Sequence, residues 1–256
     1  MRTFPSPSLR QALNGGKTVR GVFTELGCPE PVELAAIAGW DFALIDAEHG
    51  PLTAAHYPAL VRAGQAAGMP CVIRVPANEP SMIQHALDSG AAGVQIPQIA
   101  TVDQARAAID AARFHPQGKR GFNPFVRAAN YAATPVAEFL RISNDGVLVV
   151  LQLESASGVG AAAEVAALPG VDVLFVGPYD LSQSLGIPGQ VTDPSIYEAA
   201  ARIARSAARH NVALGVFTND TADARRWIEI GVRYVTFSID SVLLRRALEQ
   251  ALGSIS

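Results

Sequence analysis

Cysteine is rare in this chain of 256 residues, which contains only Cys28 and Cys71. The two lie far apart in the sequence, and neither belongs to a Cys-x-x-Cys pair. The sequence therefore indicates neither a disulfide framework nor a thiolate metal site. Long apolar runs are missing as well: none approaches the length of a membrane span, and residues 1–13 lack the apolar core of a secretory signal. We expect a cytoplasmic protein with no membrane partner.

Basic charge is also limited. The net charge is -3 and charged residues make up 17% of the sequence, whereas a general nucleic-acid binder would show a basic stripe or a high pI. Apolar residues make up 49% of the sequence, which predicts a well-buried interior and argues against disorder. The expected partners are therefore small molecules and not nucleic acids.

Short β-rich runs alternate with Ala-rich stretches of helical spacing, the pattern of βαβ units around a parallel sheet. Eight strands are predicted, at residues 21–25, 42–46, 71–75, 93–97, 147–153, 173–177, 213–217 and 234–238. Apolar residues recur at three- and four-residue intervals between them, as in segments 31–38, 80–89, 102–113, 197–210 and 221–230. We expect an α/β fold in which residues 1–256 form a single domain, a (β/α)8 TIM barrel.

One connection, residues 114–130, lacks apolar periodicity and concentrates Arg, Asn and aromatic residues. Long irregular connections in compact domains are commonly functional or disordered. Because it comes after the fourth predicted strand, we expect it to cover the mouth of the barrel.

Two acidic residues stand just past the ends of consecutive apolar runs: Glu154 after the fifth predicted strand and Asp180 after the sixth. The carboxyl ends of parallel strands are where ligands bind, so these acids could share one hard metal ion. Gln152 adds another oxygen donor, and the all-oxygen set suits Mg²⁺ or Mn²⁺. The alternative is that both acids cap the helices that follow them.

Asp46, Glu48 and His49 end the second predicted strand in the same way. A carboxylate beside an imidazole fixes its tautomer and raises its basicity, so Asp46 orienting His49 would make a general base. The alternative is a surface histidine in a turn. We assign that simpler interpretation to the remaining histidines, which lie away from strand ends: His56, His85, His115 and His210.

Arg74 ends the third predicted strand. A guanidinium at that depth needs an anionic partner, and an enolate or carboxylate oxygen of a substrate would provide one. A structural salt bridge to an acid on a neighbouring strand is the competing explanation.

The scarcity of lysine separates two mechanisms for a keto substrate. A Schiff-base enzyme needs a lysine amine in its pocket, but Lys17 precedes the first predicted strand and Lys119 lies in the irregular connection. A metal must then polarise the substrate carbonyl.

Four motifs, in this order, resemble the HpcH/HpaI family of metal-dependent (class II) pyruvate aldolases, of the 4-hydroxy-2-oxoheptanedioate or 2-keto-3-deoxy acid aldolase type. They are Leu44-Ile45-Asp46-Ala47-Glu48-His49, Arg74-Val75-Pro76, Leu151-Gln152-Leu153-Glu154 and Val176-Gly177-Pro178-Tyr179-Asp180-Leu181-Ser182. The resemblance implies a barrel of the phosphoenolpyruvate/pyruvate type, a divalent metal ion (Mg²⁺ or Mn²⁺, with Co²⁺ and Zn²⁺ as alternatives) and a homohexamer built as a trimer of dimers.

The resemblance also assigns roles. Glu154 and Asp180 would ligate the metal, and Gln152 would line the substrate site. Arg74 would bind the substrate and stabilise its enolate, and His49 with Asp46 would act as acid and base.

In the same family pattern, the turn of Gly177, Pro178, Tyr179 and Asp180 would hold the pyruvate carboxylate with its backbone amides. Asp88 matches an acid that reaches a neighbouring subunit's site.

Two features depart from the family pattern: Tyr179 stands where a small residue is common, and the sequence of residues 121–127 is unusual. Both leave the pyruvate half of the site intact and put the acceptor aldehyde in question.

The predicted function is reversible retro-aldol cleavage of a 4-hydroxy-2-oxo acid to pyruvate, or hydroxypyruvate, and an aldehyde. One alternative is a CoA-thioester lyase of the citrate or malyl-CoA type, whose nucleotide phosphates would need basic residues such as Arg120 and Arg127 near the mouth. The other is a non-catalytic ligand-binding relative. An apolar carboxy-terminal helix, residues 242–252, could dock or exchange between subunits.

Overall fold

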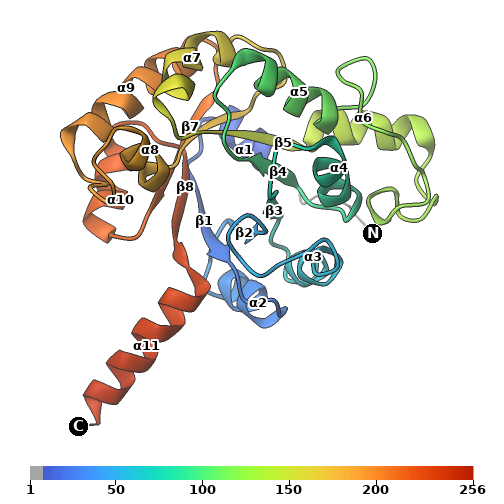
Figure 1. Ribbon diagram of the computed structural model, residues 1–256. Coiled ribbons are helices and arrows are strands. Elements are labelled where there is room, and N and C mark those ends of the chain that lie inside the picture. Colours follow the sequence, from blue (N-terminus) through green and yellow to red (C-terminus); the bar gives the residue numbers. More distant parts are fainter. Residues whose placement is uncertain (1–7, 256) are drawn as a thin grey trace.

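Eight parallel strands close into a barrel in the order of the sequence. The computed structural model (Figure 1) describes residues 8–255; residues 1–7 and 256, which the predicted domain includes, lie outside the described part. The strands are β1 (Val19–Thr24), β2 (Phe42–Asp46), β3 (Cys71–Arg74), β4 (Gly93–Ile96), β5 (Leu148–Leu153), β6 (Val173–Val176), β7 (Ala213–Thr218) and β8 (Tyr234–Ile239). The predicted barrel fold is confirmed, and each predicted strand lies within about two residues of an observed one.

Helices alternate with the strands around the outside (Figure 1). They are α1 (Leu9–Asn14), α2 (Glu30–Ile37), α3 (Tyr57–Ala66), α4 (Pro80–Asp88), α5 (Val102–Ala112), α6 (Val136–Gly146), α7 (Ala156–Ala166), α8 (Pro178–Ser184), α9 (Pro194–Ala208), α10 (Thr221–Glu229) and α11 (Asp240–Ser254). Side chains start several of them: Thr101 and Gln104 form a capping box on α5, and Ser155 caps α7.

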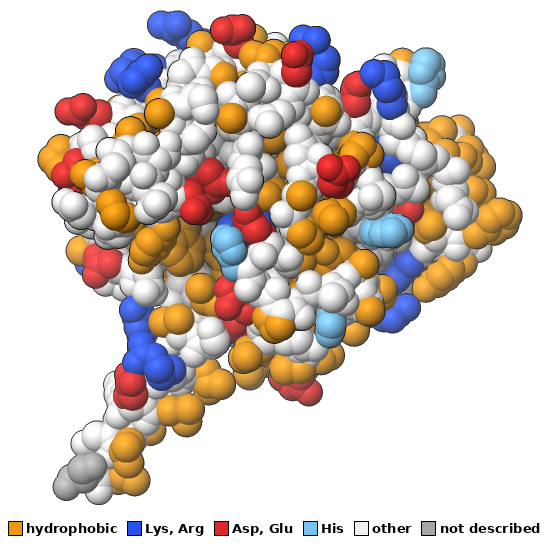
Figure 2. Space-filling model, in the orientation of Figure 1, with side chains coloured by type: hydrophobic (Ala, Val, Ile, Leu, Met, Phe, Trp, Pro, Cys, Tyr) orange, Lys and Arg blue, Asp and Glu red, His pale blue; other side chains and the backbone are white. Residues whose placement is uncertain are grey.

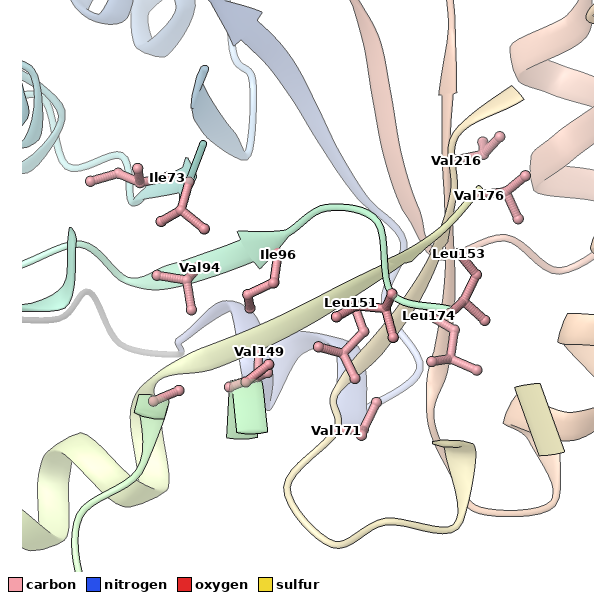
Figure 3. Close-up of a cluster of buried hydrophobic side chains, with 14 of the residues drawn as sticks. Ile73, Val94, Ile96, Val149, Leu151, Leu153, Val171, Leu174, Val176 and Val216 are labelled. Atoms are coloured by element: carbon pink, nitrogen blue, oxygen red, sulfur yellow. The ribbon is translucent and has the colours of Figure 1, made fainter. Parts of the chain in front are cut away.

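The barrel has two apolar layers because alternate residues of a strand face opposite sides. Along β5, Leu148 and Val150 belong to the core inside the barrel, whereas Val149, Leu151 and Leu153 pack outward against the helices. Figure 3 shows the outward layer, in which side chains from neighbouring strands meet. The same alternation turns the last inward-facing residues of the strands toward the barrel mouth.

The amino-terminal end of the barrel is closed by α1 and by an ion cluster. Leu9 and Leu13 of α1 join the inner core. Asp172, just before β6, accepts hydrogen bonds from Arg10 Nε at 2.6 Å, Arg113 Nη2 at 2.9 Å and the backbone N–H of Val149 at 2.8 Å. A buried acid with this many donors holds the base of the barrel together.

The irregular connection does not cover the mouth as predicted. It follows α5, which carries the chain back to the amino-terminal end of the barrel, and it packs beside the carboxyl ends of α3 and α4. Arg120 donates to Asp88 at 2.6 Å and Arg127 donates to the carbonyl of Ser89 at 2.8 Å. The prediction was wrong because it counted the strand that precedes the segment and overlooked the helix between them.

The last helix, α11, leaves the barrel and projects into solvent (Figure 1). None of its residues is buried, and Leu244, Leu248 and Leu252 are more than half exposed. The predicted carboxy-terminal helix is therefore present and has an apolar surface uncovered by this chain. Within residues 8–255, no helix is both long and apolar enough to cross a bilayer.

Replacing Asp172 by Ala should destabilise the fold by about 3 kcal/mol, because Arg113, whose side chain is fully buried, would lose its anionic partner. The midpoint of urea unfolding, followed by circular dichroism, measures the change. Asp103→Ala is the control, since its side chain is 95% exposed and lies 4.0 Å from Arg106; it should change stability by about 0.5 kcal/mol at most. Equal effects of the two substitutions would contradict this role for Asp172.

Candidate active site

A pocket of about 320 Å³ opens at the carboxyl ends of the strands, the end at which barrel enzymes carry their sites. Most of the sequence-predicted residues meet there, and the space-filling view shows acidic side chains and a histidine gathered beside hydrophobic ones near the middle of one face (Figure 2). The lining residues are Phe23, Glu25, His49, Arg74, Gln152, Phe175, Gly177, Pro178, Tyr179, Asp180, Phe217, Asn219, Ile239 and Val242.

Polar side chains reach the pocket floor from neighbouring strands. Asp46 pairs in register with Arg74, and Arg74 pairs with Gln95. All three are buried, and Gln95 Nε2 donates to Gln152 Oε1 at 2.6 Å. A continuous polar layer thus crosses the barrel from β2 to β5, directly above the inner apolar core.

Arg74 and Asp46 form a bidentate buried ion pair. Arg74 Nε donates to Asp46 Oδ1 at 2.8 Å and Nη2 donates to Oδ2 at 2.6 Å, while Nη1 lies 3.1 Å from Glu48 Oε2. Burial alone would lower the pKa of Arg74, but its hydrogen bonds and charge interactions with Asp46 outweigh burial and raise it. The salt bridge to an acid on a neighbouring strand is thus present, and the role of Arg74 toward a substrate stays a prediction.

The predicted pairing of Asp46 with the His49 ring is wrong. Both oxygens of Asp46 are occupied by Arg74, and the remaining contacts of Asp46 Oδ1 are with the backbone N–H groups of Glu48, at 3.0 Å, and His49, at 3.4 Å. A guanidinium on the adjacent strand presents two aligned donors, which the imidazole cannot match. The carboxylate nearest the ring is Glu48, whose Oε2 lies 3.9 Å from His49 Nε2.

His49 lines the pocket with a side chain that is 61% exposed. The ring therefore stands at the edge of the site, where water and a ligand can both reach it.

Glu154 lies at the end of β5 and is buried. Its Oε1 accepts from the backbone N–H of Gln98 at 2.7 Å, and its Oε2 accepts from Gln152 Nε2. Burial raises the pKa of Glu154 to about 7, helped by the negative charges of Glu48 and Asp180, although the two hydrogen bonds oppose the rise. The two hydrogen bonds hold the Glu154 carboxylate in place, and the charges of Glu48 and Asp180 beside it are negative.

Gly177 leaves the space that Glu154 occupies. A Cβ at position 177 would lie 2.7 Å from Glu154 Oε2 and 3.5 Å from Gln152 Nε2, closer to the oxygen than carbon atoms normally approach. The absence of a side chain at this position is thus a steric requirement of the site. Pro178 then opens α8, and no side chain caps the helix.

Three carboxylates, those of Glu48, Glu154 and Asp180, interact electrostatically in this part of the site. Burial, together with the negative charges of Asp46 and Asp180, raises the pKa of Glu48 to about 7, although Arg74 and a hydrogen bond from Gln98 oppose the rise. A divalent cation would relieve the repulsion, and an all-oxygen donor set suits a hard ion such as Mg²⁺ or Mn²⁺. Within residues 8–255 no group of three or more His, Cys, Asp and Glu side chains is arranged to hold a metal ion, so at most two of these carboxylates could serve as ligands together.

Asp88 does not reach this pocket. It pairs with Arg120 at 2.6 Å and lines a separate surface hollow with His85, Arg127 and Tyr131. Within one chain it is therefore remote from the residues above, and its role in a neighbouring subunit's site stays a prediction.

Several residues that line the pocket or lie behind it were missed from the sequence. Glu48 was noticed but given no role, and Gln95 and Glu25 were not singled out. Their signal was position: each faces inward at, or just past, the end of a strand. Burial, together with the charges of Asp46 and Asp240, raises the pKa of Glu25. The aromatic side chains Phe23, Phe175 and Phe217 were counted as strand residues, although the same alternation turns them toward the pocket.

Known proteins resemble this chain over nearly its whole length. A hydroxypyruvate/pyruvate aldolase of Paraburkholderia phytofirmans is 34% identical, covering 100% of this chain and 99% of that protein. A 5-keto-4-deoxy-D-glucarate aldolase of Shigella boydii is 33% identical, covering 96% of this chain and 95% of that protein.

Solved structures give the same result. The crystal structure of an HpcH/HpaI aldolase/citrate lyase family protein from Burkholderia cenocepacia superimposes with a TM-score of 0.91 at 40% identity, covering 96% of this chain and 98% of the other. The sequence pattern of that family matches residues 20–247. The chain belongs to the HpcH/HpaI aldolase/citrate lyase family.

Proposed function

We propose that this protein is a class II pyruvate aldolase, which cleaves a 4-hydroxy-2-oxo acid to pyruvate or hydroxypyruvate and an aldehyde and runs the reverse condensation. The observation that supports it best is the position of Arg74, which lies in the polar layer and interacts with the nearby carboxylates of Glu48 and Glu154. The family membership and the aldolase names of the relatives agree with this activity.

We further propose that Glu154 and Asp180 hold a divalent metal ion, Mg²⁺ or Mn²⁺, with Glu48 close by. When bound, such an ion polarises the carbonyl of a 2-oxo acid and lowers the cost of negative charge there. In family members generally, activity depends on a divalent metal. Gln152 and the turn of residues 177–180 would orient the substrate carboxylate.

Different residues of this chain would then carry out different parts of the reaction. Cleavage breaks the C3–C4 bond: the C4 hydroxyl loses its proton, its carbon becomes the aldehyde, and the electron pair passes to C3. His49, at the pocket edge, would take that proton directly or through water. Arg74, held by Asp46, would stabilise the negative charge that develops on the substrate oxygen.

The CoA-thioester alternative is weakened by the position of its cations. Arg120 and Arg127 were expected near the mouth, but they lie at the opposite end of the barrel, bonded to Asp88 and to Ser89. A non-catalytic relative would have no need for three repelling carboxylates at the barrel mouth, two of them with buried side chains. We also propose that the protein is a hexamer, a trimer of dimers, because the exposed leucines of α11 form an apolar surface that another subunit could cover. The single-domain organisation and the cytoplasmic location stay predictions.

Pyruvate release from a panel of 4-hydroxy-2-oxo acids, measured with lactate dehydrogenase, tests the function. Chelation of divalent ions should abolish release, and Mn²⁺ or Mg²⁺ should restore it. Glu154→Gln should lower turnover at least about 100-fold at saturating metal, because the ligand charge is lost. Full activity after exhaustive chelation would contradict the proposed mechanism.

Arg74→Lys should lower turnover about 100-fold while changing the metal concentration for half-maximal activity less than about 3-fold, because lysine keeps the charge but loses the bidentate fork. Steady-state kinetics at varied Mn²⁺ separate the two quantities. Arg113→Lys, at the base of the barrel, is the matched control and should keep its turnover. Equal losses of turnover and metal affinity in Arg74→Lys would argue against the role given to Arg74.

Gly177→Ala should raise the half-saturating metal concentration about 10-fold, since the new methyl group displaces the Glu154 carboxylate. Gly160→Ala is the control, because a Cβ there meets nothing within 4 Å and alanine favours the helix by about 0.5–1 kcal/mol. The same metal titration serves both variants. Identical titration curves for Gly177→Ala and the unmodified protein would show that Glu154 is not constrained in this way.

A further inference from the structure

The pocket has two chemically different halves. The half formed by β2, β3 and β5 presents Arg74 and Gln152, backed by Asp46 and Glu154. The opposite half, formed by β6 to β8 and β1, presents apolar side chains: Phe23, Phe175, Phe217, Ile239 and, from the start of α11, Val242. The groups proposed to hold the 2-oxo acid lie in the first half and in the turn of residues 177–180 that follows β6, so the aromatic side chains of β1 and β7, together with Val242, are left for the aldehyde.

The apolar half is a wall of aromatic rings. The rings of Phe23 and Phe217 meet edge to face with centroids 5.3 Å apart, and the ring of Tyr179 lies 6.1 Å from that of Phe217. Tyr179 is 51% exposed, so much of its surface is available to a ligand. Apolar surface that becomes buried on binding favours a ligand of the same character.

Two cations lie near this wall, and each has contacts within the protein: the guanidinium of Arg74 lies over the ring of Phe23, 4.8 Å from its centroid, and Arg246 of α11 donates to the backbone carbonyl of Asn219 at 3.4 Å. Among residues 8–255, the lining contains one arginine and no lysine, and the guanidinium of Arg74 is occupied by Asp46 and Glu48. Lys17 and Lys119 pair with Asp41 and Asp110 and do not line the pocket.

Negative charge is present as well. The carboxyl group of Glu25 lines the pocket, and that of Asp240, which accepts from the backbone N–H groups of Glu25 and Leu26 at 3.1 Å, stands behind it. An anionic aldehyde would lose part of its hydration and meet the like charge of Glu25, while Arg74, which is paired with Asp46 and Glu48, is assigned to the 2-oxo acid.

We propose that the aldehyde partner is uncharged and has an apolar, aromatic body that packs on Phe23, Phe217, Tyr179 and Val242. The proposal rests on the proposed aldolase function. In the condensation, C3 of pyruvate loses a proton and bonds to the aldehyde carbon, and the aldehyde oxygen gains a proton, so atoms and electrons balance without another reactant. Specificity then comes from the wall and not from the pyruvate half.

Two matched aldehydes test this, benzaldehyde and 4-formylbenzoate, which share a ring and differ by one carboxylate. Exchange of the pyruvate methyl protons in D2O, followed by NMR without any aldehyde, first tests the aldolase function alone. With Mn²⁺ and pyruvate, kcat/KM for benzaldehyde should exceed that for 4-formylbenzoate at least about 30-fold. Exchange combined with equal or reversed preference would overturn the proposal and leave the aldolase function standing. Absence of exchange would overturn both.

A variant provides a second test, in which the expected result is a gain of activity that a folding defect could not produce. Val242→Lys places a cation on the wall and should reduce the benzaldehyde preference about 10-fold, by a gain in kcat/KM for 4-formylbenzoate. Ile230→Lys, on an exposed residue at the end of α10, is the matched control and should leave the preference unchanged. A preference that is the same in Val242→Lys as in the control would show that the aldehyde does not contact this wall.

Discussion

The buried ion pair between Arg74 and Asp46 is the interaction on which the site depends. It joins the ends of β2 and β3 in register and fixes the guanidinium through two hydrogen bonds. A buried charge without its partner costs several kcal/mol, so neither residue can be lost without disturbing the other. The pair also places one positive charge where Glu48, Glu154 and Asp180 bring negative ones, and this balance allows a cluster of acids to exist inside the barrel mouth.

The alternation of inward- and outward-facing residues along each strand explains where the polar and the apolar side chains of the site lie. Inward positions that are apolar near the base, such as Leu148 and Val150, give way along the same strand to Gln152. The matching inward positions of β6 and β7 stay apolar through Phe175 and Phe217. One geometric rule therefore places polar side chains at the ends of β2 to β5 and aromatic ones at the ends of β6 and β7.

Much of the fold and of the candidate site could be predicted from the sequence. The periodicity of the apolar residues predicts the barrel, and the residues just past the predicted strand ends are those expected at its mouth. The partners of those residues could not be predicted. Asp46 is three residues from His49 in the chain, yet it bonds to Arg74, which is twenty-eight residues away and adjacent only across the sheet. The irregular connection was placed at the wrong end because its position was taken from the fourth strand, although the predicted helix at residues 102–113 returns the chain to the opposite end of the barrel. The only signal for Glu25 and the aromatic side chains was their position at or near strand ends, and nothing in their residue types separated them from ordinary strand residues.

The central claim is that the acids at the ends of β5 and β6 bind a divalent cation next to the 2-oxo acid. Electron paramagnetic resonance of Mn²⁺ titrated into the metal-free protein measures this directly. The account predicts one tightly bound Mn²⁺ per chain, with a spectrum that changes when pyruvate is added and a site that is lost in Asp180→Asn. Mn²⁺ that binds equally well to that variant, or that does not respond to pyruvate, would contradict it.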